Sequence, residues 1–109
     1  MEQRKFERFD CAFQIKYGLS GSDQKYSYSV SKNISKGGLC MPALSTIAKY
    51  GDLVKMDIKD DAREKGISVT GKVRWMRMLD RKAPMDEEIG IEFLDQDPVM
   101  MERFIRSHA

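Results

Sequence analysis

Residues 67–78 read ISVTGKVRWMRM, and this is the longest stretch in the chain that alternates apolar and polar side chains. If the stretch is extended, its odd-numbered positions as far as Trp75 share one face, and serine, threonine, lysine and arginine occupy the other. Gly71 in its middle predicts a β-bulge or the close approach of another backbone segment. The same pattern favours Trp75 in the core over a role as a stacking platform. It favours Arg74 and Arg77 as surface charges, with a place for one of them at the rim of a ligand site as the alternative.

Shorter runs of strand character flank this stretch, at residues 11–17, 26–34, 39–41, 53–58 and 88–94. Glycine, serine, asparagine and aspartate separate them and favour turns. Residues 44–49 fit either a loop or one turn of helix. The last segment differs, because Asp97 followed by Pro98 is an N-cap and first-turn pair that predicts a helix over 97–107. Strands at near-regular spacing with one closing helix predict a small antiparallel barrel or sandwich.

The size and charge of the chain restrict its class. A length of 109 residues predicts a single domain, with a charged arm at 1–10, a barrel at 11–94 and the helix after it. Nineteen basic and seventeen acidic residues leave a net charge of +2, which is low for a nucleic-acid-binding protein. No run approaches the roughly 18 apolar residues that cross a bilayer, and the charged N-terminus is unlike a secretory signal. We therefore expect a cytoplasmic protein without membrane insertion.

Few residues are of the kinds that carry catalysis or bind metals. The two cysteines, Cys11 and Cys40, lie in apolar surroundings and are expected to be buried thiols, and the only histidine is His108. We find no pattern of metal ligands and no nucleophile with a base, so we expect no metal, no catalytic residues and no enzymatic activity. Two acidic pairs are predicted to be solvated in loops, at Asp60/Asp61 and Glu87/Glu88.

Two short motifs carry the candidate function. Arg4 and Arg8 are four residues apart in the arm, so both can point to one side whether the arm is extended or helical. Asn33, Ser35 and Gly38 follow in a turn that ends the second predicted strand. Guanidinium forks on an arm, together with fixed donors and acceptors on a turn, suit a compact anionic ligand.

These motifs resemble the PilZ domain: Arg4-x-x-x-Arg8 precedes the first predicted strand, and Asn33-x-Ser35-x-x-Gly38 ends the second. The later segments GKVRW at 71–75 and IGIEF at 89–93 are also similar to that family. The resemblance implies a six-stranded antiparallel β-barrel with a short C-terminal α-helix. It also implies a bacterial receptor for the second messenger cyclic di-GMP, of a kind associated with motility and biofilm control, with no cofactor other than this ligand. Its ligand contacts would be Arg4, Arg8, Asn33, Ser35 and Gly38. Many members carry aspartate where this chain has Asn33.

The chemistry of cyclic di-GMP suits these residues. An arginine fork can meet the O6 and N7 acceptors of guanine or the phosphate oxygens, and guanidinium planes stack on purines. The carboxamide of Asn33 can pair with a guanine edge, the Ser35 hydroxyl can donate or accept, and Gly38 leaves room for a close approach. Because the arm has few apolar residues, our hypothesis is that ligand orders it and thereby signals to a downstream effector protein.

Two other functions are compatible with the sequence. A domain of the same fold could act through protein contacts without binding nucleotide. A small barrel could also bind RNA or a single strand through Tyr26, Tyr28 and the basic positions of the long strand, although the near-neutral charge argues against this. The downstream partner, and whether one or two cyclic di-GMP molecules bind, stay open.

Overall fold

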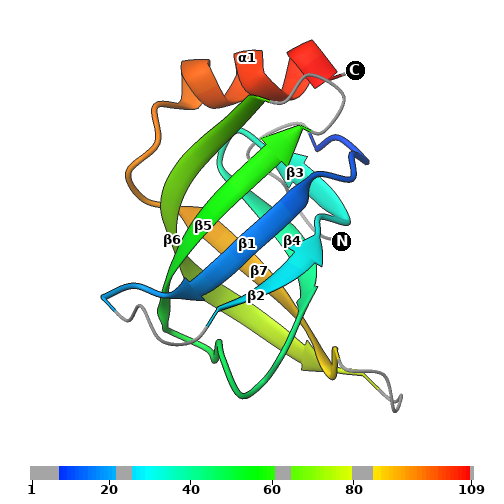
Figure 1. Cartoon of the computed structure of the whole chain (residues 1–109), viewed down its shortest axis with the longest axis vertical. Coiled ribbons are helices and arrows are strands. Elements are labelled where there is room, and N and C mark those ends of the chain that lie inside the picture. Colours follow the sequence, from blue (N-terminus) through cyan, green and yellow to red (C-terminus); the bar gives the residue numbers. More distant parts are fainter. Residues whose placement is uncertain (1–7, 22–25, 61–64, 80–84, 109) are drawn as a thin grey trace, which may run out of the picture.

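The computed structural model describes residues 8–21, 26–60, 65–79 and 85–108. They form one curled, antiparallel, seven-stranded sheet and one helix (Figure 1). This confirms the predicted mainly β barrel class with a short C-terminal helix. The elements are β1 (Gln14–Leu19), β2 (Tyr26–Val30), β3 (Asn33–Ser35), β4 (Gly38–Ala43), β5 (Leu53–Asp60), β6 (Lys65–Met78), β7 (Glu87–Phe93) and α1 (Pro98–His108).

The sheet has one strand more than the six expected, because the run predicted at 26–34 is divided in two. The strand order is β2-β1-β5-β6-β7-β4-β3, so β2 and β3 lie at opposite edges although only two residues separate them. Between them, the Ser31 hydroxyl donates to the Cys11 carbonyl at 2.6 Å, and the Lys32 amide donates to the Cys40 carbonyl at 2.8 Å. The Ser29 hydroxyl also donates to the Pro42 carbonyl at 2.6 Å. These bonds bring β2 against β4 and close the curl.

The core fills the concave side of the sheet, as the alternation predicts. In β5 every second residue is buried, and the other strands contribute apolar side chains to the same cluster. Gly71 permits the close approach that its position predicted, because a Cβ there would lie 2.3 Å from Ile91 Cγ2 and 2.8 Å from the Glu92 carbonyl oxygen. The core cluster includes Ile15, Tyr17, Ile34, Leu39, Met41, Val54, Met56, Ile58, Val69, Val73, Ile89 and Ile91.

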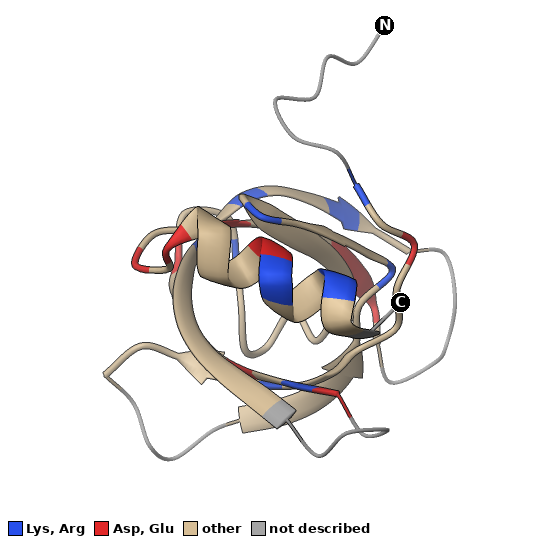
Figure 2. Cartoon of the chain, turned by 90° about the horizontal axis from the view of Figure 1, so that it is seen from above, with Lys and Arg blue, Asp and Glu red and all other residues tan. Residues whose placement is uncertain are grey.

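The helix α1 lies across one end of the curled sheet (Figure 2). Its first turn is capped by Asp97, whose carboxylate accepts the Val99 amide at 2.9 Å. Met101 and Ile105 are fully buried, and Phe104 stacks on Phe13 with ring centroids 5.0 Å apart. Within the described ranges, no helix is long and apolar enough to cross a membrane.

The prediction that the acidic pairs are solvated in loops is wrong for the three members that the structure describes. Asp60 ends β5, Glu87 and Glu88 begin β7, and all three side chains are buried. Asp61 lies outside the described residues. The error arose because two adjacent charges are typical of loops, whereas strand pairing continues to these positions: Asp60 pairs with β6, and Glu87 and Glu88 pair with both β4 and β6.

Glu87 is the most constrained of these carboxyls, with 0 % of its surface exposed. Neither of its carboxylate oxygens has a hydrogen-bond partner among the described residues. Burial raises the pKa of Glu87, and the nearby Asp86 and Asp52 raise it further, while Lys49 acts in the opposite direction. The native state therefore favours the protonated form of this side chain.

The pH dependence of stability follows from this shift. Because the pKa of Glu87 is higher in the folded state, the unfolded chain loses this proton first as pH rises, and the free energy of unfolding falls. We expect Glu87→Gln to have a higher free energy of unfolding than the parent at pH 7. The difference between the two proteins should shrink as pH falls and become constant below 4.5, the ordinary pKa of a glutamate carboxyl. Urea unfolding of both proteins across pH measures this. A difference that does not change with pH would contradict it, and Glu102→Gln on α1 is the surface control.

Candidate functional site

The structure brings Arg8 of the arm to Asn33 of the predicted turn motif. Phe9 pairs with Ile34 through two backbone hydrogen bonds of 2.8 and 2.9 Å, which hold this part of the arm beside β3 (Figure 1). Arg8 Nη1 then donates to Asn33 Oδ1 at 3.2 Å. Two motif residues 25 positions apart therefore meet at the β3 edge of the sheet. Arg4, the other arginine of the motif, lies outside the described residues.

Ser35 and Gly38 shape the hairpin between β3 and β4. The Ser35 hydroxyl accepts the Gly37 amide at 3.2 Å and donates to the Gly38 carbonyl at 3.4 Å. A Cβ on Gly38 would lie 2.1 Å from the Ile91 carbonyl oxygen of β7, a distance that no side chain tolerates. Both residues therefore position the turn that presents Asn33, a structural role that spacing alone did not indicate.

A row of paired residues leads from Asn33 across the convex face of the sheet. Asn33 pairs with Cys40, Cys40 with Gly90, and Gly90 with Trp75, so the four positions face the same side. Gly90 leaves the room that the indole occupies, because a Cβ there would lie 2.0 Å from Trp75 Nε1. The indole of Trp75 thus lies over the backbone of β7.

The prediction that Trp75 is a core residue is wrong. A register shift between Val73 and Trp75 places a β-bulge at this point of β6. The bulge turns Trp75 to the convex face, where 39 % of its surface is exposed, while Val73 stays in the core. The alternation along 67–78 favoured the core over a stacking surface for Trp75, and the bulge reverses that choice. The signal that could have found it is Gly90 within the Ile-Gly-Ile run, because a strand glycine marks close approach of another group.

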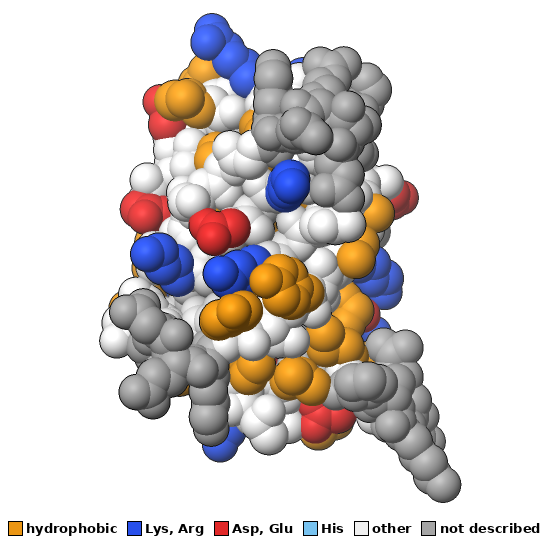
Figure 3. Space-filling view, viewed as in Figure 1, with side chains coloured by type: hydrophobic (Ala, Val, Ile, Leu, Met, Phe, Trp, Pro, Cys, Tyr) orange, Lys and Arg blue, Asp and Glu red, His pale blue; other side chains and the backbone are white. Residues whose placement is uncertain are grey.

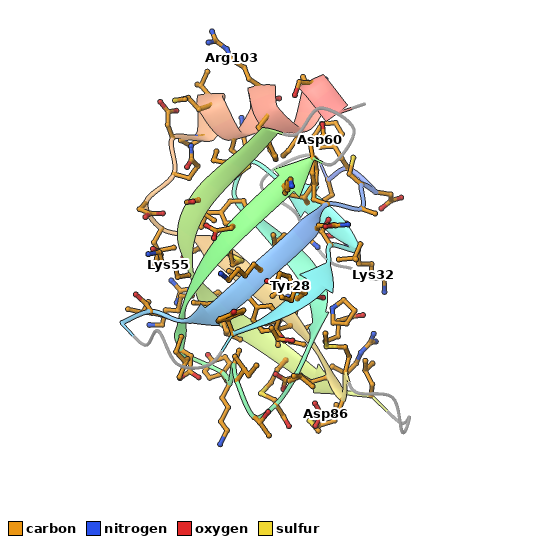
Figure 4. The ribbon with its side chains drawn as sticks, in the orientation of Figure 1. Tyr28, Lys32, Lys55, Asp60, Asp86 and Arg103 are labelled. Carbon is orange, nitrogen blue, oxygen red and sulfur yellow. The ribbon has the colours of Figure 1, made fainter. Side chains whose placement is uncertain are left out.

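Basic side chains and one carboxylate surround this row. Glu88 accepts Arg77 Nη2 at 2.9 Å and lies 3.5 Å from the Lys32 ammonium, so it links β7 to both neighbouring basic groups. Lys32 immediately precedes Asn33 (Figure 4). From the sequence, Glu88 was expected to be solvated, and Lys32 was given no role in binding. Arg77 was expected at the surface, with the rim of the ligand site as the alternative.

Cys40 lies in the row but is a poor nucleophile. It is buried, as predicted, whereas Cys11 is half-buried. Burial and the neighbouring Glu88 raise the pKa of the Cys40 thiol to about 11, against a smaller opposite effect of Lys32 and Arg8. The thiol is therefore protonated at neutral pH and contributes packing.

The site thus combines a guanidinium, a carboxamide and an indole on one convex face, with Lys32 and Arg77 at its margin. The indole offers a flat surface for an aromatic ring, and the carboxamide can read a hydrogen-bonding edge. The guanidinium suits phosphate or a pair of adjacent acceptors. The arrangement fits a planar, anionic ligand with polar edges.

Comparisons with known proteins agree on one family. The sequence profile of the PilZ domain matches residues 2–107. No curated protein matches the chain by sequence.

Solved structures share the fold at low sequence identity. The PilZ domain of Escherichia coli YcgR with c-di-GMP has a TM-score of 0.71 and 12 % identity, over 97 % of this chain and 88 % of that one. The Bacillus subtilis inhibitor of motility MotI/DgrA has a TM-score of 0.71 and 17 % identity, and the match covers 98 % of this chain and 52 % of that one. The K. pneumonia MrkH–c-di-GMP complex has a TM-score of 0.69 and 14 % identity, and the match covers 98 % of this chain and 51 % of that one. The chain spans about half the length of MotI/DgrA and MrkH. With the profile match over nearly its whole length, this chain belongs to the PilZ domain family.

Proposed function

We propose that this chain is a non-catalytic receptor that binds cyclic di-GMP on the convex face formed by β3, β4, β7 and β6. The observation that carries the proposal is the 3.2 Å hydrogen bond between Arg8 and Asn33, at one end of the row that leads to Trp75. The family supports the choice of ligand, because the structures of YcgR and MrkH named above contain c-di-GMP.

Each residue of the proposed site has a distinct role. Arg8, and Arg4 from the part of the arm before it, would bind a phosphate or the O6 and N7 edge of a guanine. Asn33 would pair with a guanine edge, and Trp75 would stack on a purine face. Ser35 and Gly38 would act by holding the β3–β4 turn in place. Lys32 and Arg77 would add positive charge at the margin.

The arm supplies the proposed signal. Phe9 and Cys11 hydrogen-bond to β3 and to Ser31, so the chain that follows Arg8 is already attached to the barrel. Ligand that engages both arginines would order the remaining arm and change the surface offered to an effector protein.

The alternative is a protein-interaction domain of the same family that does not bind nucleotide. One observation favours it: the Glu88 carboxylate bonds to both Arg77 and Lys32 and so neutralises part of the basic margin. A ligand with two phosphates gains less from side chains that are already paired.

Trp75 provides a direct test, because it is the only tryptophan of the chain. If a purine stacks on it, cyclic di-GMP should change the intrinsic fluorescence in a saturable way, and GTP at the same concentration should not. Trp75→Ala should weaken binding by about 1–3 kcal/mol, the usual loss of a base–aromatic stack, and Trp75→Phe by less. Binding seen by another method with unchanged emission and unchanged affinity in Trp75→Ala would remove Trp75 from the site.

A further inference from the structure

A second surface of the barrel has the features of a binding site. It is the convex face of β2, β1 and β5, three strands that carry none of the residues of the row that ends at Trp75. Tyr26, Gly18 and Lys55 pair across the three strands, and the next row is Tyr28, Lys16 and Asp57. Figure 3 views this face and shows hydrophobic side chains beside basic and acidic ones, and Figure 4 labels Tyr28 and Lys55 on it.

The face is hollowed at its centre. Gly18 has no side chain to fill the space between its two neighbours, and a depression of about 450 Å³ lies there. A group of several atoms fits into this volume. Its lining includes Lys16, Gly18, Leu19, Tyr26, Lys55 and Asp57.

The hollow presents two ammonium groups. Lys16 Nζ lies 4.1 Å from the centroid of the Tyr26 ring, a cation–π contact that holds this side chain over the surface. Lys55 lies in the neighbouring row on the other side of Gly18. Among the described residues, no carboxylate lies within ion-pair distance of either lysine. Asp57 is the single acid among the described residues of the lining, against two lysines, so the hollow suits an anionic group.

Apolar surface adjoins the hollow on β2. Tyr28 is 62 % exposed and Val30 is also exposed, and both point outward beside Lys16. The two tyrosines meet edge to face with centroids 6.0 Å apart, so the accessible Tyr28 ring packs against Tyr26. Exposed tyrosines are typical of protein-binding surfaces, because they contribute contact area with little loss of entropy.

We propose that this face binds an acidic segment of a partner protein, with a carboxylate between Lys16 and Lys55 and a neighbouring apolar side chain against Tyr28 and Val30. Charge complementarity favours this occupant over a second copy of the chain, which would bring lysines against lysines. A single-stranded nucleic acid fits less well, because Lys16 covers the Tyr26 ring and leaves Tyr28 alone as a stacking surface.

The face is continuous with the proposed nucleotide site. β2 leads through Ser31 and Lys32 directly into Asn33, and the Ser31 hydroxyl donates to the carbonyl of Cys11, the residue that follows the arm. Ligand that moves the arm would therefore act on the end of β2. This link between the two sites rests on the proposed function as a cyclic di-GMP receptor, whereas binding of an acidic segment does not.

The test is a selection from a random peptide display library with the full chain as bait, followed by anisotropy measurements on the selected peptides. We expect acidic peptides with aromatic or aliphatic neighbours, whose amide-shift changes map to Lys16, Tyr28 and Lys55. Lys55→Glu should weaken them at least about tenfold, since it replaces an attraction by a repulsion. Tyr28→Ala should weaken them without any change in charge.

Arg103→Glu is the matched control, because it makes the same charge change on α1 at the far end of the barrel (Figure 4). Selection of basic peptides, of none, or of peptides that bind Lys55→Glu normally would overturn the proposal. The proposal would also be overturned if the chain bound oligothymidylate in a way that depends on Lys55 and bound no peptide. Calorimetry with cyclic di-GMP on the same variants separates the two sites: Lys55→Glu should leave nucleotide affinity unchanged, and loss of nucleotide binding alone would count only against the receptor function.

Discussion

Arg8→Ala is expected to weaken cyclic di-GMP binding by about thirtyfold or more, a loss of about 2 kcal/mol. Arg8 is the one arginine of the arm that the structure places, half-buried beside Asn33. A guanidinium in such a partly desolvated position forms charge-assisted bonds that neither water nor a small side chain replaces. Calorimetric titration of the variant and the parent measures the effect.

A second variant at Arg8 separates charge from geometry, and a variant on α1 serves as the control. Arg8→Lys keeps the charge but loses the planar fork, so it should recover only part of the affinity. Arg103→Ala removes an exposed arginine of α1 and should bind as the parent does. Thermal unfolding of Arg8→Ala should stay close to that of the parent, because this side chain is only half-buried and lies outside the hydrophobic core. Near-parental affinity in Arg8→Ala would exclude it from the ligand contacts.

Gly38→Ala is expected to have the largest effect on stability, a loss of about 2–4 kcal/mol in the free energy of unfolding. The added Cβ would meet the Ile91 carbonyl oxygen at 2.1 Å and the Glu92 Cα at 3.3 Å. These are backbone atoms of β7, which cannot rotate away as a flexible side chain can. The variant must therefore separate β4 from β7 and disturb the hairpin that carries Asn33.

Gly66→Ala is the matched control for Gly38→Ala. It also places a methyl group on a strand glycine, but its closest contact is the Ile58 carbonyl oxygen at 3.3 Å, which a small adjustment relieves. Urea unfolding should therefore show a much lower midpoint for Gly38→Ala than for Gly66→Ala. Equal midpoints would show that β4 and β7 can adjust and that Gly38 is not needed for their packing.

Residues with strong local signals were predicted well from the sequence. Alternation identified the buried face of β5, and Asp97 marked the start of α1. The glycine at 71 was expected to allow a close approach and does. The motif residues Arg8 and Asn33 were grouped by resemblance to a family, since nothing local relates two positions that far apart, and the structure brings them together.

The features that were missed depend on contacts between distant strands. Trp75 fits the core pattern of β6 until the bulge beside Val73 reverses the alternation, and that bulge is set by pairing with β7. The adjacent carboxylates Glu87 and Glu88 predict exposure to solvent, but both are buried in β7 because β4 and β6 extend far enough to pair there. The division between β2 and β3 reflects closure of the curl through Ser29, Ser31 and Lys32, a property of the whole sheet.

Isothermal titration calorimetry of the purified chain with cyclic di-GMP tests the receptor function most directly, with GTP and cyclic di-AMP as controls. We predict selective binding at micromolar concentration or below, and the stoichiometry will show whether one or two molecules occupy the site. No heat with cyclic di-GMP, together with no competition against a fluorescent analogue, would contradict the receptor function. It would leave the fold intact and favour a PilZ domain that acts through protein contacts alone.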